Sequence, residues 1–289
     1  MKLLSLAIIT LASASAFAAK SNTQYYFQPG ASNHVVEANY LMDVKPAKTE
    51  TAGVETDAKQ EMSDIYLNYT YGMSDNHAIG LETFFGNNKT TTGTTSSTAS
   101  GMGDIHVYYK GFSEIWHYGA DLGFNTEKIK LDATTGAIDN RSTGGMSFKA
   151  NVGVMVNNAA MNYGADLSYL MPLERKVDNA AGTTLTGGNT LKLAPFLEYN
   201  WGMGFLGAEL SYNMMDDTKM DTSGVETTFK GESYAGFLLY GTYDFNEMFT
   251  GILDLGMNMH PEHEETNVAG TKVKAYTETI VNIGLRMTF

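Results

Sequence analysis

Apolar residues occupy every second position in the last segment of the chain, and this spacing recurs along much of the sequence. Val281, Ile283, Leu285, Met287 and Phe289 share one face of that segment, and the residues between them are polar or small. A period of two is that of a β-strand, whose successive side chains point to opposite faces. The segment is therefore predicted to be a strand with one apolar and one polar face, either in a soluble sandwich or in a membrane.

The same alternation predicts twelve strands joined by connections of two sizes. Their approximate ranges are 34–43, 61–72, 77–87, 101–111, 116–126, 145–157, 160–171, 189–200, 204–214, 228–244, 248–259 and 273–289. The five tight connections are at 73–76, 113–115, 157–159, 201–203 and 245–247, and the six others are long and polar, among them 44–59 and 87–100. Because short and long connections alternate, all long loops are expected at one end of the sheet. Outer-membrane barrels sort their loops in this way, whereas a soluble sandwich has no reason to do so.

The two faces of the predicted strands differ in polarity in the way that a barrel in lipid requires. The segment DIYLNYTYG places Ile65, Leu67 and Tyr69 on one face, and Asp64 and Asn68 on the other. The second face is too charged for the core of a sandwich, but it suits the inside of a barrel whose outer face meets lipid. Aromatic residues gather near both ends of the apolar face, as expected at the lipid headgroups.

The N-terminal segment has the pattern of an export signal. Lys2 precedes an apolar stretch that ends at the small-residue site Ala16-Phe17-Ala18, so residues 1–18 are predicted to be a cleaved signal peptide. Residues 19–289 are then expected to form a single transmembrane β-barrel domain, since no change of composition marks a boundary. No later segment approaches the roughly 18 continuous apolar residues of a membrane helix.

Composition narrows the possible chemistry. The sequence contains no cysteine, which excludes disulfides and metal–thiolate sites. Its formal net charge is −13, and losing Lys2 with the signal peptide changes this to −14. A chain this acidic is not expected to bind nucleic acid.

A terminal Phe289 that follows alternating apolar residues resembles the C-terminal signature of bacterial outer-membrane β-barrel proteins. The resemblance covers the whole mature chain as a pattern, but only the last ten or so residues as a motif. It implies an all-β, antiparallel up-and-down transmembrane barrel with short periplasmic turns and six long extracellular loops. It also implies residence in the bacterial outer membrane, contact with its lipid bilayer, and recognition of Val281, Ile283, Leu285, Met287 and Phe289 by the barrel assembly machinery.

Almost every predicted strand places one carboxylate on its inward face. The expected inward acids are Glu37, Asp43, Asp64, Glu82, Asp104, Asp121, Asp166, Glu198, Glu209, Glu232, Asp254 and Glu278. The expected inward bases are Lys110, Lys149, Lys192, Lys230, Lys274 and Arg286. The excess of acids predicts a narrow channel that favours cations and carries ions or small solutes by passive diffusion. The barrel is expected to be a monomer. The alternative is a non-conducting structural or surface-interaction barrel that is filled by its own polar side chains and presents its extracellular loops. Twelve strands lie between filled and open barrels, so strand number does not decide.

The sequence gives little support for an enzyme, a metal site or a cofactor. Some outer-membrane barrels are phospholipases with a Ser-His-Asn set on the lipid-facing surface, but no histidine here alternates onto that face beside a serine. His106 and His117 are predicted to face inward instead. The segment HPEHEE (260–265) offers imidazole and carboxylate groups, but its interpretation as a solvated loop tip is preferred to a metal site. Inward glycines, among them Gly80, Gly153 and Gly207, are predicted either to enlarge the lumen or to curve the sheet.

Overall fold

The structure, a computed structural model, describes residues 27–51, 53–130, 140–158, 160–178, 182–265 and 271–289. The predicted signal peptide, residues 1–18, lies outside the described residues. Within the described part of the chain, no helix is long and apolar enough to cross a membrane.

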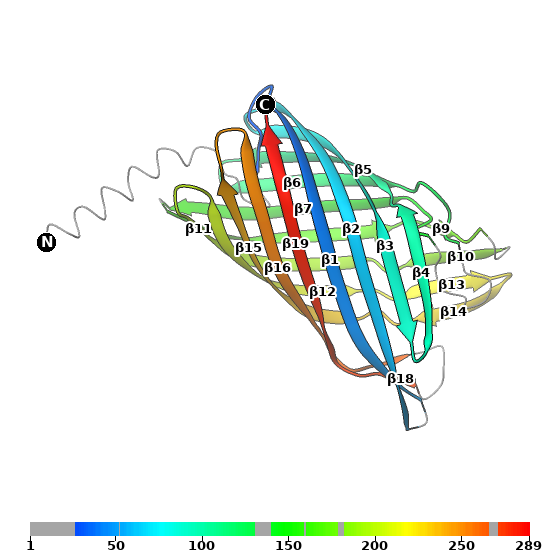
Figure 1. Cartoon of the computed structure of the whole chain (residues 1–289). Helices are drawn as coiled ribbons and strands as arrows, with labels where there is room; N and C mark the ends of the chain where they lie inside the picture. The colour runs from blue at the N-terminus through cyan, green and yellow to red at the C-terminus, as the bar shows by residue number, and fades with distance from the viewer. Residues whose placement is uncertain (1–26, 52, 131–139, 159, 179–181, 266–270) are drawn as a thin grey trace, which may run out of the picture.

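Twelve strands pair edge to edge in antiparallel order and close on themselves (Figure 1). In order around the wall they are β1 (His34–Thr51), β2 (Val54–Ser74), β3 (His77–Thr92), β5 (Ile105–Ser113), β6 (Trp116–Phe124), β7 (Ser147–Asn158), β8 (Met161–Pro172), β11 (Thr190–Asn200), β12 (Phe205–Met215), β15 (Ser233–Asp244), β16 (Phe249–His260) and β19 (Tyr276–Thr288). The predicted closed antiparallel barrel of twelve strands is confirmed.

The barrel closes where the first and last strands of the wall meet. β1 pairs with β19 from Val35 opposite Thr288 to Val44 opposite Thr279. At the end of this seam, the His34 N–H donates to the Phe289 carbonyl at 2.8 Å, and the Phe289 N–H donates to the His34 carbonyl at 2.9 Å. Closure leaves no open edge in the wall, which is the condition for exposing a sheet to lipid.

The short connections lie where the alternation predicts them, but most of the long ones contain strands of their own. β1 and β2 continue as a paired hairpin to Thr51 and Val54, through the range predicted as the loop 44–59. The Thr/Ser-rich range 87–100 also forms a hairpin, in which β3 turns at Gly93 into β4 (Thr95–Met102). These loop predictions were wrong because repeated threonines favour extended backbone, and hairpin pairing satisfies the polar groups of that backbone.

A second, smaller sheet lies beyond the wall. It consists of β9 (Arg175–Lys176), β10 (Thr183–Gly187), β13 (Thr218–Thr222) and β14 (Val225–Phe229), in the order β14–β13–β10–β9. These strands come from the two long connections that follow β8 and β12. Two further short strands, β17 (His263–Glu265) and β18 (Thr271–Val273), extend the wall beside β1. Figure 1 shows these additions at the end of the barrel away from the C-terminus.

The wall is apolar outside and polar inside. On β2 the outward side chain of Leu67 is 44% exposed, whereas the inward Asp64 is only 1% exposed. Large outward residues such as Ile283 and Leu285 on β19 are likewise exposed. Few apolar side chains are buried inside the barrel, and Met155, Phe196 and Phe112 form a small cluster there. The burial pattern is therefore the reverse of that of a soluble domain.

Glycines in the wall make room for aromatic side chains of the neighbouring strand. A Cβ added at Gly80 would lie 2.1 Å from Cζ of Tyr108, and one at Gly207 would lie 2.3 Å from Cζ of Tyr240. Both rings therefore lie flat against the inner wall. These glycines allow the lumen to be filled with side chains rather than enlarging it.

Candidate functional site

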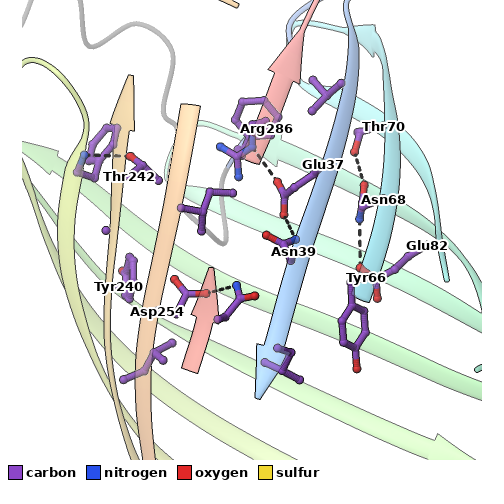
Figure 2. Close-up of a pocket in the computed structure, with 18 of the residues that line it drawn as sticks. Glu37, Asn39, Tyr66, Asn68, Thr70, Glu82, Tyr240, Thr242, Asp254 and Arg286 are labelled. Atoms are coloured by element: carbon purple, nitrogen blue, oxygen red, sulfur yellow. Dashed lines mark hydrogen bonds and ion pairs between the residues drawn. The ribbon is translucent and has the colours of Figure 1, made fainter. Parts of the chain in front are cut away.

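Two cavities in the lumen form the candidate functional site. The first has a volume of about 450 Å³ and is lined mainly by β1, β2, β5, β15, β16 and β19. Figure 2 shows its polar side chains, which come from neighbouring strands on either side of the β1–β19 seam. The second has a volume of about 350 Å³ and is lined mainly by β5, β6, β7, β8 and β11. Glu82 and Lys110 line both cavities, so these two residues mark where they meet.

An ion pair across the closing seam occupies one side of the first cavity. Arg286 Nε donates to Glu37 Oε2 at 2.9 Å, and Asn39 donates to the other oxygen of Glu37 at 2.7 Å. The two ionic residues are direct partners in the β1–β19 register, which accounts for their meeting. The Arg286 guanidinium also lies 4.0 Å from the centre of the Phe27 ring. Phe27, from the segment before β1, therefore lies inside the lumen.

A chain of hydrogen bonds joins three strands on the same side. Tyr108 donates from its hydroxyl to Asn68 Oδ1 at 2.7 Å, and the hydroxyls of Tyr108 and Thr70 lie 2.5 Å apart. Asn68 in turn donates to Glu82 Oε2 at 3.2 Å. Glu82 has no cation within ion-pair distance among the described residues. Its charge is therefore available to the cavity.

Two further acids, one on β16 and one on β11, are held by neutral partners. Asp254 on β16 accepts a hydrogen bond from Asn282 at 2.7 Å and lines the first cavity. Glu198 on β11 is fully buried and accepts from Tyr240 at 2.8 Å and from Asn162 at 3.3 Å. These hydrogen bonds fix the positions of the carboxylates without placing a counter-charge beside them.

Acids in the part of the lumen around the second cavity are paired with basic residues, and of these Asp166, His117 and Lys192 line the cavity itself. His106 Nδ1 lies 2.8 Å from Asp121 Oδ1, and His117 Nε2 lies 2.6 Å from Asp166 Oδ2. Lys192 pairs with the buried Glu209 at 2.6 Å. The other two lysines in this part of the lumen are Lys110 and Lys149, both of which line the cavity.

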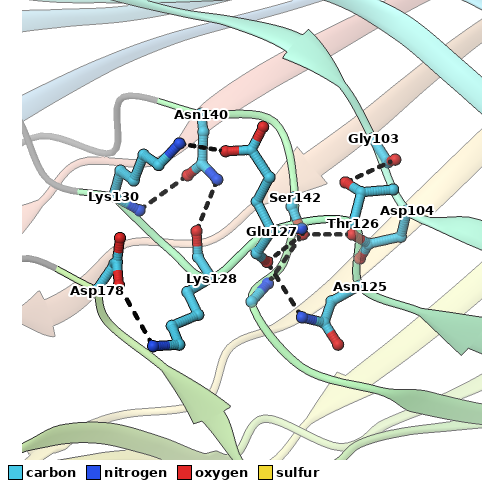
Figure 3. A network of polar contacts seen from close by, with 11 residues as sticks. Gly103, Asp104, Asn125, Thr126, Glu127, Lys128, Lys130, Asn140, Ser142 and Asp178 are labelled. Carbon is cyan, nitrogen blue, oxygen red and sulfur yellow. Dashed lines mark hydrogen bonds and ion pairs between the residues drawn. The ribbon is translucent and has the colours of Figure 1, made fainter.

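The segment after β6 folds into the half of the lumen that lies toward the long connections. Arg141 Nη2 lies 2.5 Å from Asp64 Oδ2 on the inner wall, and its guanidinium lies over the Phe84 ring. The neighbouring Ser142 donates to Asp104 Oδ1 at 2.6 Å, and Thr143 donates to Asp104 Oδ2. Figure 3 shows how Asp104, Ser142 and Asn140 hold this segment in place. Asp64 and Asp104 are thus occupied by an inserted segment.

A second cluster lies inside the barrel where β15, β16 and β19 approach the long connections. His260 is stacked between the rings of Tyr234 and Tyr276, with centroids 4.4 and 4.3 Å away. Its two ring nitrogens lie 3.0 Å from Glu232 and 3.2 Å from Glu278. Lys45 pairs with the same Glu278 at 2.8 Å, and with Asp43 at 3.8 Å.

The structure corrects several sequence predictions about charged residues. His260 was assigned to a solvated loop tip but is buried in the barrel, because β16 continues one residue beyond the predicted strand. Lys274 was assigned to the inner wall but pairs with Glu50 and Glu262 beyond β19. Lys230 was also predicted to face inward, but it lies before β15 and pairs with Asp217 at 2.7 Å. That bond and the Gly231 N–H lower the pKa of the Asp217 carboxyl, which lies in the connection after β12.

The remaining residues predicted to line the lumen lie on its inner wall. They are Glu37, Asp64, Glu82, Asp104, Asp121, Asp166, Glu198, Glu209, Asp254, Glu278, Lys110, Lys149, Lys192 and Arg286. Sequence reasoning missed the cations Arg141 and Lys45. Arg141 lies in a predicted loop, and Lys45 lies beyond the predicted end of the first strand. Among the described residues, no group of three or more His, Asp or Glu side chains is arranged to hold a metal ion.

The residues of the C-terminal signature lie on the outer face of β19. Ile283, Leu285 and Phe289 are about half exposed, and Val281 and Met287 are partly exposed. The Phe289 ring stacks on His34 with centroids 5.6 Å apart. An apolar stripe therefore runs along the strand that closes the barrel.

Comparison with known proteins identifies the architecture. No protein-family model and no characterised sequence matches the chain. An outer-membrane channel from Pseudomonas putida F1 aligns with a TM-score of 0.67 at 10% identity, covering 93% of this chain and 99% of that chain. The P. putida toluene transporter TodX aligns with a TM-score of 0.48 at 9% identity, covering 94% of each chain. The Escherichia coli outer-membrane protease OmpT aligns with a TM-score of 0.38 at 11% identity, covering 90% of this chain and 97% of that one.

At such low identity, the first of these similarities establishes a shared fold and nothing more. The other two fall below a TM-score of 0.5 and carry no argument. The chain therefore has the fold of a bacterial outer-membrane barrel.

Proposed function

We propose that residues 19–289 form a monomeric barrel in the bacterial outer membrane and let small polar solutes diffuse through a narrow lumen. The observation that carries the proposal is a closed wall with an apolar outer face and two cavities bordered by charged and polar groups. A wall of this kind is stable in lipid, because its backbone groups are paired within the sheet. Water that filled these cavities would provide a path for ions.

Narrowness is supported by the side chains that fill the barrel. Tyr108 and Tyr240 lie against the wall, Phe27 enters with the segment before β1, and Arg141 enters with the segment after β6. The free cross-section is therefore smaller than a bare twelve-strand wall would leave. We expect passage of ions and small solutes, and exclusion of larger ones.

Cation preference is the finer part of the proposal. Inward acids outnumber inward bases, and Arg141 and Lys45 reduce the excess without removing it. Glu82 and Asp254 border the first cavity and are held by amide groups rather than by cations. In a narrow space these charges are screened less than in bulk water, so they should attract cations.

The second candidate is a non-conducting barrel that presents its extracellular strands. It is favoured by the Arg141–Asp64 contact, which attaches an inserted segment to the inner wall. In either case we propose that the barrel is not an enzyme and needs no metal or cofactor.

Reversal potentials in a salt gradient test the cation preference. The double variant Glu82→Gln/Asp254→Asn removes two lumen charges and keeps the size of both side chains. Each new amide oxygen can still accept the hydrogen bond from Asn68 or Asn282. It should lower the cation preference, most visibly at low salt. Glu262→Gln is the matched control, because Glu262 lies outside the lumen and pairs with Lys272 and Lys274. An unchanged reversal potential in the double variant, or an equal change in the control, would refute the role of the two acids.

A further inference from the structure

The second cavity differs from the rest of the lumen because three lysines line it. Lys110 comes from β5, Lys149 from β7 and Lys192 from β11, three strands that are not adjacent in the wall. Lys149 is close enough to both of the others for their charges to repel. Like charges placed together in a narrow space are unfavourable unless an anion lies between them. Glu37 and Glu82 offset this repulsion at Lys110, and Asp166 offsets part of it at Lys192.

Two of these ammonium groups have no carboxylate partner. Lys192 pairs with Glu209, but neither Lys110 nor Lys149 has a carboxylate within ion-pair distance among the described residues. Lys110 Nζ lies 4.9 Å from the centre of the Tyr108 ring, and Lys149 is exposed to the lumen. Both positive charges are therefore available to a ligand in the cavity.

The acids that share this cavity are already engaged. Asp166 Oδ2 accepts hydrogen bonds from His117 at 2.6 Å and from Asn151 at 3.1 Å. Glu82 accepts from Asn68. These hydrogen bonds leave both carboxylates charged, so Asp166 and Glu82 together balance the charges of Lys110 and Lys149. Neither ammonium group has a carboxylate within ion-pair distance among the described residues, so a singly charged anion would accept hydrogen bonds from both.

The shape of the cavity provides room for more than an inorganic ion. Ser168 and Gly111 line it and are small, and Gln28 from the segment before β1 adds a hydrogen-bonding group. On another side Phe112 borders the cavity and packs against Met155 and Phe196. A ligand with a charged head and a short apolar part would place the head at the lysines and the apolar part at Phe112.

We infer that this cavity is a binding site for a small organic monocarboxylate, held by Lys110 and Lys149. The carboxylate oxygens accept charge-assisted hydrogen bonds from the two ammonium groups, which are stronger than bonds between neutral groups. The site would make the lumen locally selective for an anion within a barrel whose overall inner charge is negative. The inference does not require the barrel to conduct.

Isothermal titration of the folded, detergent-solubilised full barrel at low ionic strength tests the site. Butyrate is the probe, butyramide is its uncharged counterpart, and sulfate tests for a general oxyanion site. Butyrate should bind with measurable heat and butyramide should not. Lys149→Gln and Lys110→Gln should each weaken butyrate binding about tenfold or more, and Lys149→Arg should retain part of the affinity because it keeps the charge.

Lys48→Gln is the matched control, since Lys48 lies on the outer β1–β2 hairpin and pairs only with exposed acids. Heat-modifiable gel mobility checks that each variant is folded. Equal binding of butyrate and butyramide, no loss in Lys149→Gln, or an equal loss in Lys48→Gln would overturn the inference. Sulfate binding as tight as that of butyrate would overturn the assignment to carboxylates. Because the readout is binding, a barrel that binds butyrate but carries no current would refute the proposed channel and leave this site intact.

Discussion

Arg141 and Asp64 are 77 residues apart in the sequence, and their side chains meet inside the barrel with Nη2 2.5 Å from Oδ2. Asp64 is almost completely buried, and the Arg141 guanidinium also covers the Phe84 ring. Removing one partner of a buried ion pair generally costs about 3–5 kcal/mol, because the other charge is left without compensation. This contact therefore fixes the segment after β6 inside the lumen.

The first prediction concerns this contact. Arg141→Ala should release the inserted segment and widen the half of the lumen in which it lies. Because conduction depends on pore width, single-channel conductance should rise about twofold or more. Lys128→Ala serves as control, because Lys128 forms an exposed pair with Asp178. Equal conductance in wild type and Arg141→Ala would show that this segment does not limit flow.

The second prediction concerns assembly. Phe289→Asp places a charge at the end of the apolar stripe on β19 and removes the ring that stacks on His34. The precursor should be exported but poorly inserted, as measured by the membrane fraction and heat-modifiable gel mobility. Thr288→Ser is a conservative control beside it. Normal membrane levels of Phe289→Asp would remove the support for an assembly role.

The third prediction concerns orientation. Both termini should face the periplasm, so an epitope inserted at Gly93, the turn between β3 and β4, should be accessible on intact cells. An epitope in the short turn at Asp75–Asn76 should be accessible only after the outer membrane is opened. The reverse labelling pattern would mean that the barrel has the opposite orientation.

The fourth prediction concerns pH at the long connection between β12 and β15. The Lys230 ammonium and the Gly231 N–H lower the pKa of the Asp217 carboxyl, so the contact stabilises this connection when Asp217 is ionised. That contribution is present above the ordinary aspartate pKa and is lost as pH falls through the lowered value. Hydrogen exchange at Gly231, corrected for its intrinsic pH dependence, should lose protection in acid, and Asp217→Asn should abolish that pH dependence. Equal pH dependence in both proteins would contradict this role.

The strands of the barrel wall could be predicted from the sequence. Lipid outside and polar groups inside require apolar and polar residues to alternate along each strand, with a period of two. Ile283 and Arg286 illustrate it, one exposed on the outer face of β19 and the other paired inside with Glu37. The short turns follow for the same reason, since they interrupt that period. Charges within the twelve wall strands could thus be placed on the inner face, whereas Lys230 and Lys274, which lie outside those strands, could not.

The partners of those charges could not be predicted in the same way. Arg141 reaches Asp64 through a connection with no periodicity, and Lys45 reaches Glu278 only because β1 continues past its apolar face. His260 was misplaced by a single residue at the end of β16. The segment HPEHEE, interpreted from the sequence as a solvated loop tip, begins with the ring that lies between Tyr234 and Tyr276. Contacts between distant segments depend on three-dimensional closure, which a local pattern does not encode.

Planar-bilayer recording of the purified wild-type barrel in a potassium chloride gradient tests the central claim most directly. The proposed narrow lumen has acids such as Glu82 and Asp254 on its wall. It predicts small, discrete current steps and a reversal potential with the sign expected when potassium is more permeant than chloride. Absence of current at every voltage and salt concentration would contradict the channel and leave the closed, loop-presenting barrel. Current whose reversal potential has the sign expected when chloride is more permeant than potassium would contradict the cation preference.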